Sequence, residues 1–175
     1  MSAEHAATST FLTASEVAHA IRNGELSARD VVEKQLDRIA RYNPALNAVV
    51  TLDADTARRR ARDADRAVSA GEFRGRLHGV PITVKDFFDT AGLSTTSGYR
   101  PFARRVPAED ATAVVRLRQA GAIILGKTDL PTLASGVQTD NPVFGRTNNP
   151  WDLQRTPGGS SGGDSGGFVI SRVGK

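Results

Sequence analysis

The residues best suited to covalent chemistry gather near the end of the chain, in the stretch PGGSSGGDSGGFV at positions 157–169. This stretch holds three serines, Ser160, Ser161 and Ser165, among six glycines. A serine hydroxyl can act as a nucleophile once a neighbouring base removes its proton. The same composition is also typical of a flexible linker or a passive backbone turn. The stretch alone therefore leaves a chemical and a purely structural interpretation open.

Three short catalytic motifs resemble this loop, and the surrounding residues argue against each of them. A phosphate loop needs a lysine after its second glycine, but Asp164 follows Gly163. A hydrolase of the G-x-S-x-G type needs a histidine downstream, yet none follows His78. A trypsin-like site at Ser165 needs an all-β setting, whereas the first 70 residues have helical patterns. The serine chemistry that remains consistent with these residues uses a lysine as the base.

Two lysines stand at the ends of apolar, strand-like runs. Lys85 closes VPITVK and Lys127 closes AIILGK. Burial disfavours the charged form of a lysine, so its pKa falls and it can serve as a general base. A lysine in this place can equally extend to solvent or pair with an acid such as Asp86. Strand position alone does not choose between these uses, nor between the two lysines.

Helical and strand patterns alternate along the chain. A capping box at Thr13 and Glu16 opens the first helix, and Asn43–Pro44 is expected to end the second. The apolar face of the third helix consists almost only of alanines, which places it on the outside. From residue 135 onward the chain is expected to be mostly loop. The predicted helices are 13–24, 27–43, 53–70 and 110–120, and the predicted strands are 46–52, 80–85 and 122–127. This alternation indicates the α/β class.

Composition excludes several kinds of site. The 175 residues include no cysteine, which rules out disulfides, thiol nucleophiles and cysteine–metal centres. The histidines His5, His19 and His78 are scattered, so we expect no metal site, and no cofactor is indicated. The first residues carry no signal-peptide pattern, and no apolar run reaches the ~18 residues of a membrane span. A cytoplasmic protein without membrane contact is expected.

The basic residues invite a nucleic-acid interpretation, which their pattern disfavours. Only four of the 23 basic residues are lysines, and many arginines alternate with acids, as in RRRARDADR at 58–66. Such alternation is typical of a solvated helix face. Aromatic residues make up 6% of the chain, so no stacking platform accompanies the positive charge. We therefore expect no nucleic-acid partner.

Several ordered blocks of this sequence resemble the amidase signature enzymes. The blocks are NPALNAVVTLD (43–53), LHGVPITVKDFFDTAGLSTTSG (77–98), DATAVVRLRQAGAIILGKTDLPTLA (110–134) and FGRTNNPWDLQRTPGGSSGG (144–163). The resemblance covers residues 1–164 almost completely, and it implies one amidase-type domain there. It further implies an α/β/α sandwich around a mixed sheet. The implied activity is hydrolysis of the C–N bond of a small carboxylic amide other than a peptide.

The resemblance also implies roles for individual residues. Lys85 would be the general base, and Ser160, preceded by a cis peptide bond, would relay protons between that lysine and a nucleophilic serine. Asp86 and Lys127 would have structural roles. Supporting positions in the loop would be Ser161, Gly158, Gly159 and Gly162.

One part of the family pattern is missing from this sequence. The resemblance implies a nucleophilic serine in a second glycine-rich motif, which the 175 residues do not contain. The fold is therefore expected to be truncated before that motif, and the chain to be inactive by itself. Residues 165–175 are interpreted as a divergent tail, a candidate for an altered reading frame. The alternative hypothesis is a non-catalytic remnant or interaction module that keeps part of the fold. The sequence does not indicate which amide is the substrate or which subunit is the partner.

Overall fold

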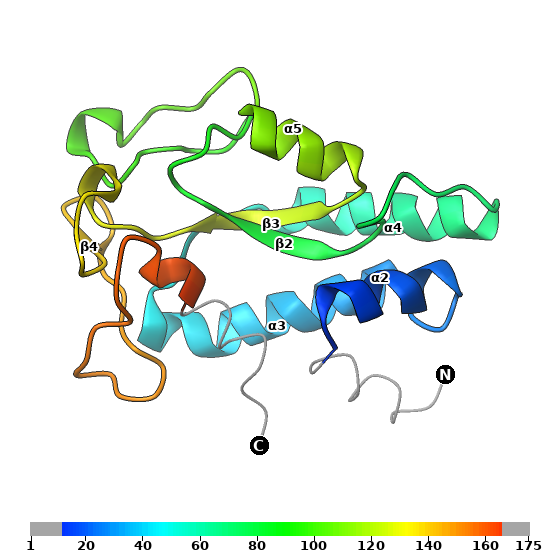
Figure 1. The fold of residues 1–175 in the computed structure, drawn as a ribbon, viewed down its shortest axis with the longest axis horizontal. Coiled ribbons are helices and arrows are strands. Elements are labelled where there is room, and N and C mark those ends of the chain that lie inside the picture. The colour runs from blue at the N-terminus through cyan, green and yellow to red at the C-terminus, as the bar shows by residue number, and fades with distance from the viewer. Residues whose placement is uncertain (1–11, 166–175) are drawn as a thin grey trace.

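A three-stranded mixed sheet forms the centre of the computed structural model, which describes residues 12–165 (Figure 1). The strand order is β1–β3–β2. Strand β1 (Val49–Leu52) runs antiparallel to β3 (Ile123–Thr128), and β2 (Pro81–Lys85) runs parallel to β3. The three strands lie where the sequence pattern predicts them, and the predicted mixed sheet is confirmed.

Helices cover both faces of this sheet. The helices are α2 (Ala14–Arg22), α3 (Ala28–Leu46), α4 (Ala54–Ser69) and α5 (Thr112–Gln119). Ile123 and Leu125 point into the core shared with α2, α3 and α4, whereas Ile124 packs with Val84 and Val114 beneath α5. Successive side chains of a strand point to opposite faces, so β3 contributes to both cores. The α/β/α sandwich is therefore confirmed.

Side-chain caps fix where the first helices begin. The Thr13 hydroxyl accepts from the backbone N–H of Glu16 at 3.2 Å, and the Glu16 carboxylate accepts from that of Thr13 at 2.6 Å. This is the predicted capping box. The Ser27 hydroxyl caps α3 by accepting from the backbone N–H of Asp30 at 3.0 Å, and Asp65 of α4 accepts from the backbone N–H of Ala28 at 2.6 Å. The Asp65 carboxylate thus ties α4 to the start of α3.

Helix α3 continues past the predicted end at Asn43–Pro44 and stops at Leu46. Pro44 lies in the last turn, where its missing N–H costs only one hydrogen bond. The Asn43 side chain then organises the exit, because its Oδ1 accepts from the N–H groups of Ala48 and Val49, both at 2.8 Å. Asn47 ends the helix in a left-handed conformation with φ of 50°. The predicted boundary was wrong by about one turn.

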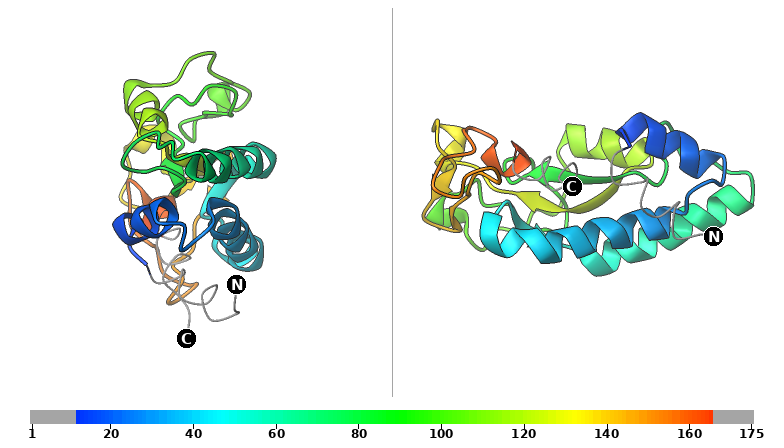
Figure 2. Two further views of the ribbon diagram at one scale, coloured as in Figure 1. Left: turned by 90° about the vertical axis from the view of Figure 1, so that its right-hand side faces the viewer. Right: turned by 90° about the horizontal axis from the view of Figure 1, so that it is seen from below.

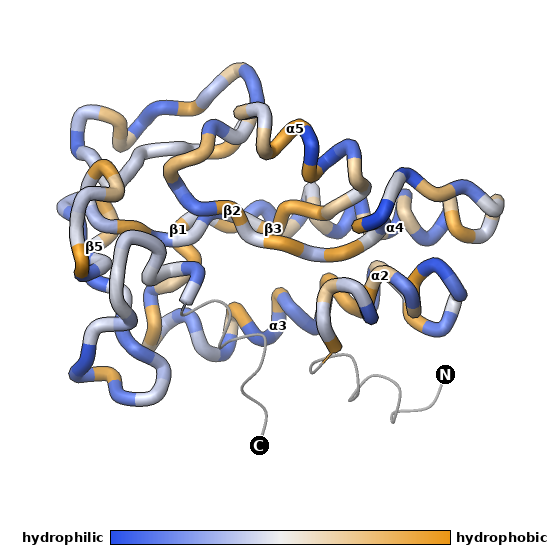
Figure 3. Tube along the Cα trace, viewed as in Figure 1, coloured by the Kyte–Doolittle hydropathy of each residue, from blue (hydrophilic) through white to orange (hydrophobic). Residues whose placement is uncertain are grey.

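Helix α4 buries a stripe of alanines and exposes its charges, as its sequence predicts. The alanines are Ala57, Ala61, Ala64 and Ala67. They let α4 run close beside α3 (Figure 2), while hydrophilic residues alternate with the alanines along α4 (Figure 3). Among residues 12–165, no helix has the length and apolar character needed to cross a membrane.

The rest of the described chain consists of loops with short regular pieces. These are the 3₁₀ turns η1 (Arg100–Phe102) and η2 (Thr132–Ala134) and the small antiparallel pair β4 (Asp140–Asn141) and β5 (Gly145–Arg146). The predicted boundary at 164/165 falls at the end of the described residues. Residues 166–175, which carry most of the predicted divergent tail, lie outside them.

Candidate active site at the glycine and serine loop

The structure brings Lys85 and Ser160 together across 75 positions of sequence. Lys85 is the last residue of β2, and its half-buried side chain donates a hydrogen bond from Nζ to Ser160 Oγ at 3.2 Å. Ser160 lies in the loop that follows β5, and the Gly159–Ser160 peptide bond is cis. The carboxyl end of a strand in a parallel pair thus faces the glycine-rich loop, a common place for a site in α/β proteins.

The glycines of this loop permit close contact between backbones. A Cβ at Gly159 would clash with the carbonyl oxygen of Gly136, and one at Gly162 would clash with Thr139 Oγ1. Gly158 has φ of +92°, a conformation that glycine adopts easily. The Thr139 hydroxyl accepts from the N–H of Gly162 and donates to the carbonyl of Gly158, both at 2.9 Å. These contacts argue against the interpretation of the loop as a free linker.

The end of the loop is anchored on the residue after β3. The N–H of Gly163 donates to the carbonyl oxygen of Asp129 at 3.1 Å, and a helical turn begins at Gly162. The N–H of Ser165 donates to the carbonyl of Ser161 at 3.1 Å within that turn. In the described part of the chain, the hydroxyl of Ser161 makes no hydrogen bond of its own. Its supporting role therefore stays a prediction.

The charge of Lys85 depends on two opposing influences. Burial lowers the pKa of the Lys85 ammonium, and the negative charge of Asp164 opposes this by a smaller amount. Burial also raises the pKa of the Asp164 carboxyl, partly offset by a hydrogen bond at 2.5 Å from the Thr128 hydroxyl and by Lys85. Thr128 pairs with Lys85 in the β2–β3 register. The lysine, the threonine and the aspartate therefore form one polar group at this edge of the sheet.

Lys127 is a buried structural lysine, which separates it from Lys85. Its fully buried ammonium donates to the carbonyl of Phe88 and to Thr95 Oγ1, both at 2.8 Å, and lies 3.6 Å from Asp86 Oδ1. Burial lowers the pKa of Lys127 to about 8. Since these partners occupy the ammonium group, Lys127 cannot reach the serine loop.

Asp86 also turns away from Lys85. Its carboxylate accepts from the N–H and the hydroxyl of Thr96, at 3.0 and 2.6 Å. Burial raises the pKa of the Asp86 carboxyl, while the bonds from Thr96 and the charge of Lys127 lower it. The pairing of Lys85 with Asp86 that strand position left open is therefore absent from the described residues.

Sequence reasoning did not identify Thr128, Thr139 or Asp129 as parts of this site. Thr128 follows Lys127 directly at the end of a strand, so a prediction that the two strands are parallel neighbours would have placed it beside Lys85. The contacts of Thr139 and Asp129 with the glycine loop join distant segments, and no local pattern marks them.

His78 serves the fold and has no place in this site. It is buried, its Nδ1 accepts from the backbone N–H of Arg74, and its Nε2 lies 3.1 Å from the carbonyl oxygen of Ala64. Both ring nitrogens are thus bound to main-chain groups, consistent with the rejection of a histidine-based serine site. Within residues 12–165, no group of three or more His, Asp or Glu side chains is arranged to hold a metal ion.

Comparison with known proteins assigns this chain to a family. A family model described as Amidase matches residues 30–171. The chain belongs to the amidase signature family. The A subunit of glutamyl-tRNA(Gln) amidotransferase from Acidothermus cellulolyticus is 48% identical over 153 residues. That match covers 87% of this chain and 30% of the relative. This amidase-family chain therefore spans about a third or less of the length of such relatives.

Solved structures of other proteins have the same fold. Fatty acid amide hydrolase superposes with a TM-score of 0.87 at 28% identity, covering 95% of this chain and 30% of the other. A structure described as "An unexpected vestigial protein complex reveals the evolutionary origins of an s-triazine catabolic enzyme" gives 0.86 at 34% identity, covering 93% and 36%. The similarity in each case extends over nearly the whole of this chain.

Proposed function

We propose that Lys85 and Ser160 form the proton-transfer half of a site that hydrolyses a carboxylic amide. The observation that carries this proposal is the hydrogen bond between Lys85 Nζ and Ser160 Oγ at 3.2 Å. Its support is twofold: the half-buried lysine has a lowered pKa, and the chain belongs to the amidase signature family. A neutral amine accepts a proton, and a bridging hydroxyl can pass one on.

In the proposed reaction, neutral Lys85 takes the Ser160 hydroxyl proton while Ser160 takes the proton of the attacking serine. The new C–O bond gives a tetrahedral intermediate. When its C–N bond breaks, the relay returns a proton to the nitrogen, so that a neutral amine leaves and an ester remains. Water attacks that ester through the same relay, which yields the carboxylic acid and restores the attacking serine. Each proton removed by Lys85 is thus returned before the cycle ends.

We further propose that the attacking serine is neither Ser160 nor Ser165. Ser160 is occupied by Lys85, and the exposed Ser165 hydroxyl donates to the carbonyl of Ser161 at 3.3 Å, within the helical turn that follows the loop. The second glycine-rich motif expected to carry the nucleophile is not found among the 175 residues. These 175 residues would then act only together with a segment that carries that serine.

The relatives' names also bear on substrate and partner. Those named as the A subunit of glutamyl-tRNA(Gln) amidotransferase belong to proteins with more than one subunit. We propose that this segment likewise functions with a partner subunit, in the cytoplasm, on a small amide.

A chimera tests the proton relay. Residues 12–165 replace the matching segment of the Acidothermus cellulolyticus relative, and ammonia release is measured with a panel of primary carboxamides. Lys85→Ala and Ser160→Ala should each lower the rate by about 10²–10⁴-fold, the usual contribution of acid–base catalysis. Ser165→Ala is the matched control and should keep full activity. An active chimera that tolerates Lys85→Ala would contradict the proposal.

The pH profile and a serine probe give independent readouts. Because Asp164 raises the pKa of Lys85, Asp164→Asn should move the acid limb of the rate profile to lower pH. A fluorophosphonate applied to the 175-residue chain should leave Ser160 and Ser165 unlabelled. Mass-spectrometric detection of the adduct on either serine would overturn the assignment of the nucleophile to another segment.

A further inference from the structure

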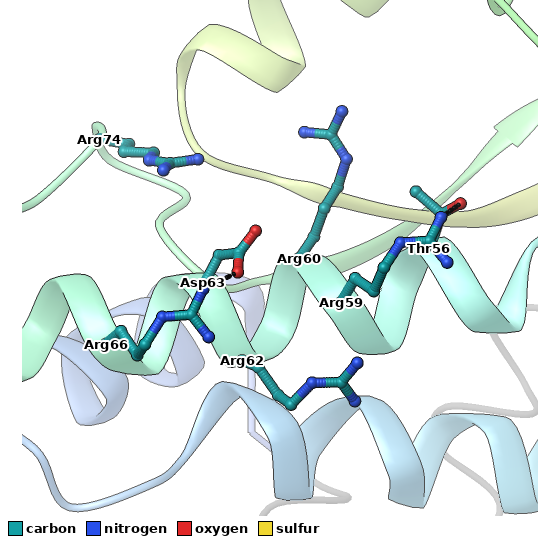
Figure 4. A pocket seen from close by; sticks show the side chains of 7 residues that line it. All are labelled: Thr56, Arg59, Arg60, Arg62, Asp63, Arg66 and Arg74. Atoms are coloured by element: carbon teal, nitrogen blue, oxygen red, sulfur yellow. Dashed lines mark hydrogen bonds and ion pairs between the residues drawn. The ribbon is translucent and has the colours of Figure 1, made fainter.

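The outward face of α4 and the segment after it form an open pocket of about 590 Å³ lined by arginines (Figure 4). The lining includes five arginines and a single carboxylate: Arg59, Arg60, Arg62, Arg66, Arg74 and Asp63. Within residues 12–165, none of these side chains is bonded to Lys85 or Ser160. The pocket is therefore a separate feature, and its composition is strongly cationic.

The acids that alternate with these arginines in sequence are directed elsewhere in the fold. Helix α4 contains Asp55, Asp63 and Asp65. Asp65 caps α3, where it accepts from the backbone N–H groups of Ala28 and Arg29. Asp55 lies 3.8 Å from Arg58, outside the pocket. Asp63 is the one carboxylate in the lining, and Asp110 acts on Arg60 from outside it. The alternation in the sequence therefore does not give a balanced surface.

Of the five arginines, only Arg66 has a bonded acid among the described residues. Among the residues that the structure describes, the guanidinium groups of Arg60 and Arg74 make no hydrogen bond or ion pair, whereas Arg66 is paired with Asp63 at 2.5 Å. Arg74 reaches toward Asp63 from the segment after α4, and Arg60 projects to the same side (Figure 4). Partial burial lowers the pKa of the Arg60 guanidinium, and the positive charges of Arg118 and Arg74 lower it further. The guanidinium groups of Arg60 and Arg74 therefore repel each other, and their N–H donors are available to a ligand.

We propose that this pocket binds a compact anion that carries two or more phosphate groups. The planar guanidinium group presents paired donors that match phosphate oxygens, so Arg60 and Arg74 can each bind in a bidentate manner. Arg59, held by a 2.7 Å hydrogen bond to the Thr56 hydroxyl, contributes a further positive charge at the rim. Arg62 points away from Arg60 and Arg74 (Figure 4) and adds only long-range attraction.

The lining favours a compact anion over a nucleic acid. No aromatic side chain lines the pocket, so a base would find no surface on which to stack. The volume lies in the range of pockets that take small ligands. Several negative charges close together are needed to offset the mutual repulsion of several guanidinium groups around one pocket. A chain of phosphates supplies these charges in a small volume. A single monovalent anion would leave most of the repulsion in place.

Calorimetric titration of the 175-residue chain with inorganic tripolyphosphate, at physiological ionic strength, tests the proposal. Saturable one-to-one binding is expected. Arg60→Gln and Arg74→Gln should each weaken it by about tenfold or more, as expected for losing a charge-assisted hydrogen bond. Arg155→Gln removes an equal charge from a surface pair outside the pocket and should change affinity by less than about twofold.

Two further variants separate binding from folding. Asp63→Asn removes the one carboxylate of the pocket and should tighten binding, a result that damage to the fold would not produce. Arg60→Lys keeps the charge but loses the paired donors, so its affinity should fall between those of the native chain and Arg60→Gln. Far-ultraviolet circular dichroism verifies that each variant is folded.

Three outcomes would overturn the proposal. The first is the absence of saturable tripolyphosphate binding by the native chain. The second is an equal loss in Arg155→Gln, which would indicate only a general response to net charge. The third is binding of a duplex RNA that tripolyphosphate does not displace, because the ligand would then be a nucleic acid backbone.

Discussion

At the scale of single residues, Asp129 links the glycine loop to the protein interior. It is fully buried, and burial raises the pKa of its carboxyl from the ordinary 3.8 to about 6. Asn141 Nδ2 donates to Oδ1 at 2.6 Å, and Oδ2 lies 2.9 Å from the Thr147 hydroxyl, which also reaches the carbonyl of Asn47 at 2.8 Å. A protonated Oδ2 can donate to Thr147 while Thr147 donates to Asn47. The neutral acid therefore satisfies every partner.

The raised pKa of Asp129 makes the free energy of unfolding depend on pH. Because the folded state holds this proton more tightly, the stabilisation is complete below about pH 4 and is lost as the pH rises through about 6. The full change corresponds to at most about 3 kcal/mol. Asp129→Asn mimics the neutral acid, so its stability relative to the native chain should increase across this window. Urea unfolding at several pH values measures the difference.

A matched control separates this effect from general loss of negative charge. Asp55→Asn removes a carboxylate whose side chain is 88% exposed, and it is measured at the same pH values as a variant with the same change of charge. If the difference between Asp129→Asn and the native chain is constant with pH, Asp129 does not titrate as its burial indicates.

The residue scale also shows how far sequence reasoning could go at the site. The local patterns around Lys85 and Lys127 are alike, and only partners from other segments distinguish them. Lys127 is held by Phe88 and Thr95, and Lys85 faces Ser160. The family resemblance favoured Lys85. A family motif indicates which distant segments come together in the fold, whereas an apolar run indicates only a local strand. Asp129 was missed because the residues next to it in sequence do not indicate that its carboxyl group is buried.

At the scale of elements, the contact between α3 and α4 depends on small side chains. Ala57 and Ala61 are completely buried there. Replacing Ala61 by leucine would insert a larger side chain into a packed interface, and the free energy of unfolding should fall by about 1–3 kcal/mol. Ala40 lies on the exposed face of α3, so Ala40→Leu should change the stability by no more than about 0.5 kcal/mol. Thermal or urea unfolding of both variants provides the comparison, and equal effects would count against tight packing.

Sequence patterns predicted these elements well and their ends less well. Thr13 and Ser27 mark the helix starts through interactions within a few residues, which sequence displays directly. The end of α3 was misplaced because Pro44 is tolerated in a last turn whose exit is bonded by the Asn43 side chain. The alanine stripe predicted which face of α4 is buried. It could not show that Asp65 caps α3. The Asp65 carboxylate therefore does not pair with the arginines of α4, and their positive charge is not offset by it.

At the scale of the whole molecule, one end of the fold exposes several large apolar side chains on a single segment. The outward face of α4 is cationic, whereas the segment 131–157 gathers at one end of the molecule (Figure 1) and exposes several large apolar side chains. They are Leu133, Val137, Trp151 and Leu153, with Val137 84% and Trp151 78% exposed. Single exposed apolar residues are ordinary, but several on one segment favour association.

We therefore predict that the 175-residue chain self-associates as its concentration rises, through segment 131–157. Burial of exposed apolar side chains drives such contacts, and the net positive charge opposes them only at low salt. The weight-average mass in sedimentation experiments should increase with concentration, and the emission of Trp151, the one tryptophan, should shift to shorter wavelength. Val137→Lys should weaken the association, whereas Ser69→Lys adds the same charge at the exposed end of α4 and should weaken it much less. A monomer at all concentrations would contradict the prediction, and equal effects of the two lysines would show that charge alone, not this segment, controls it.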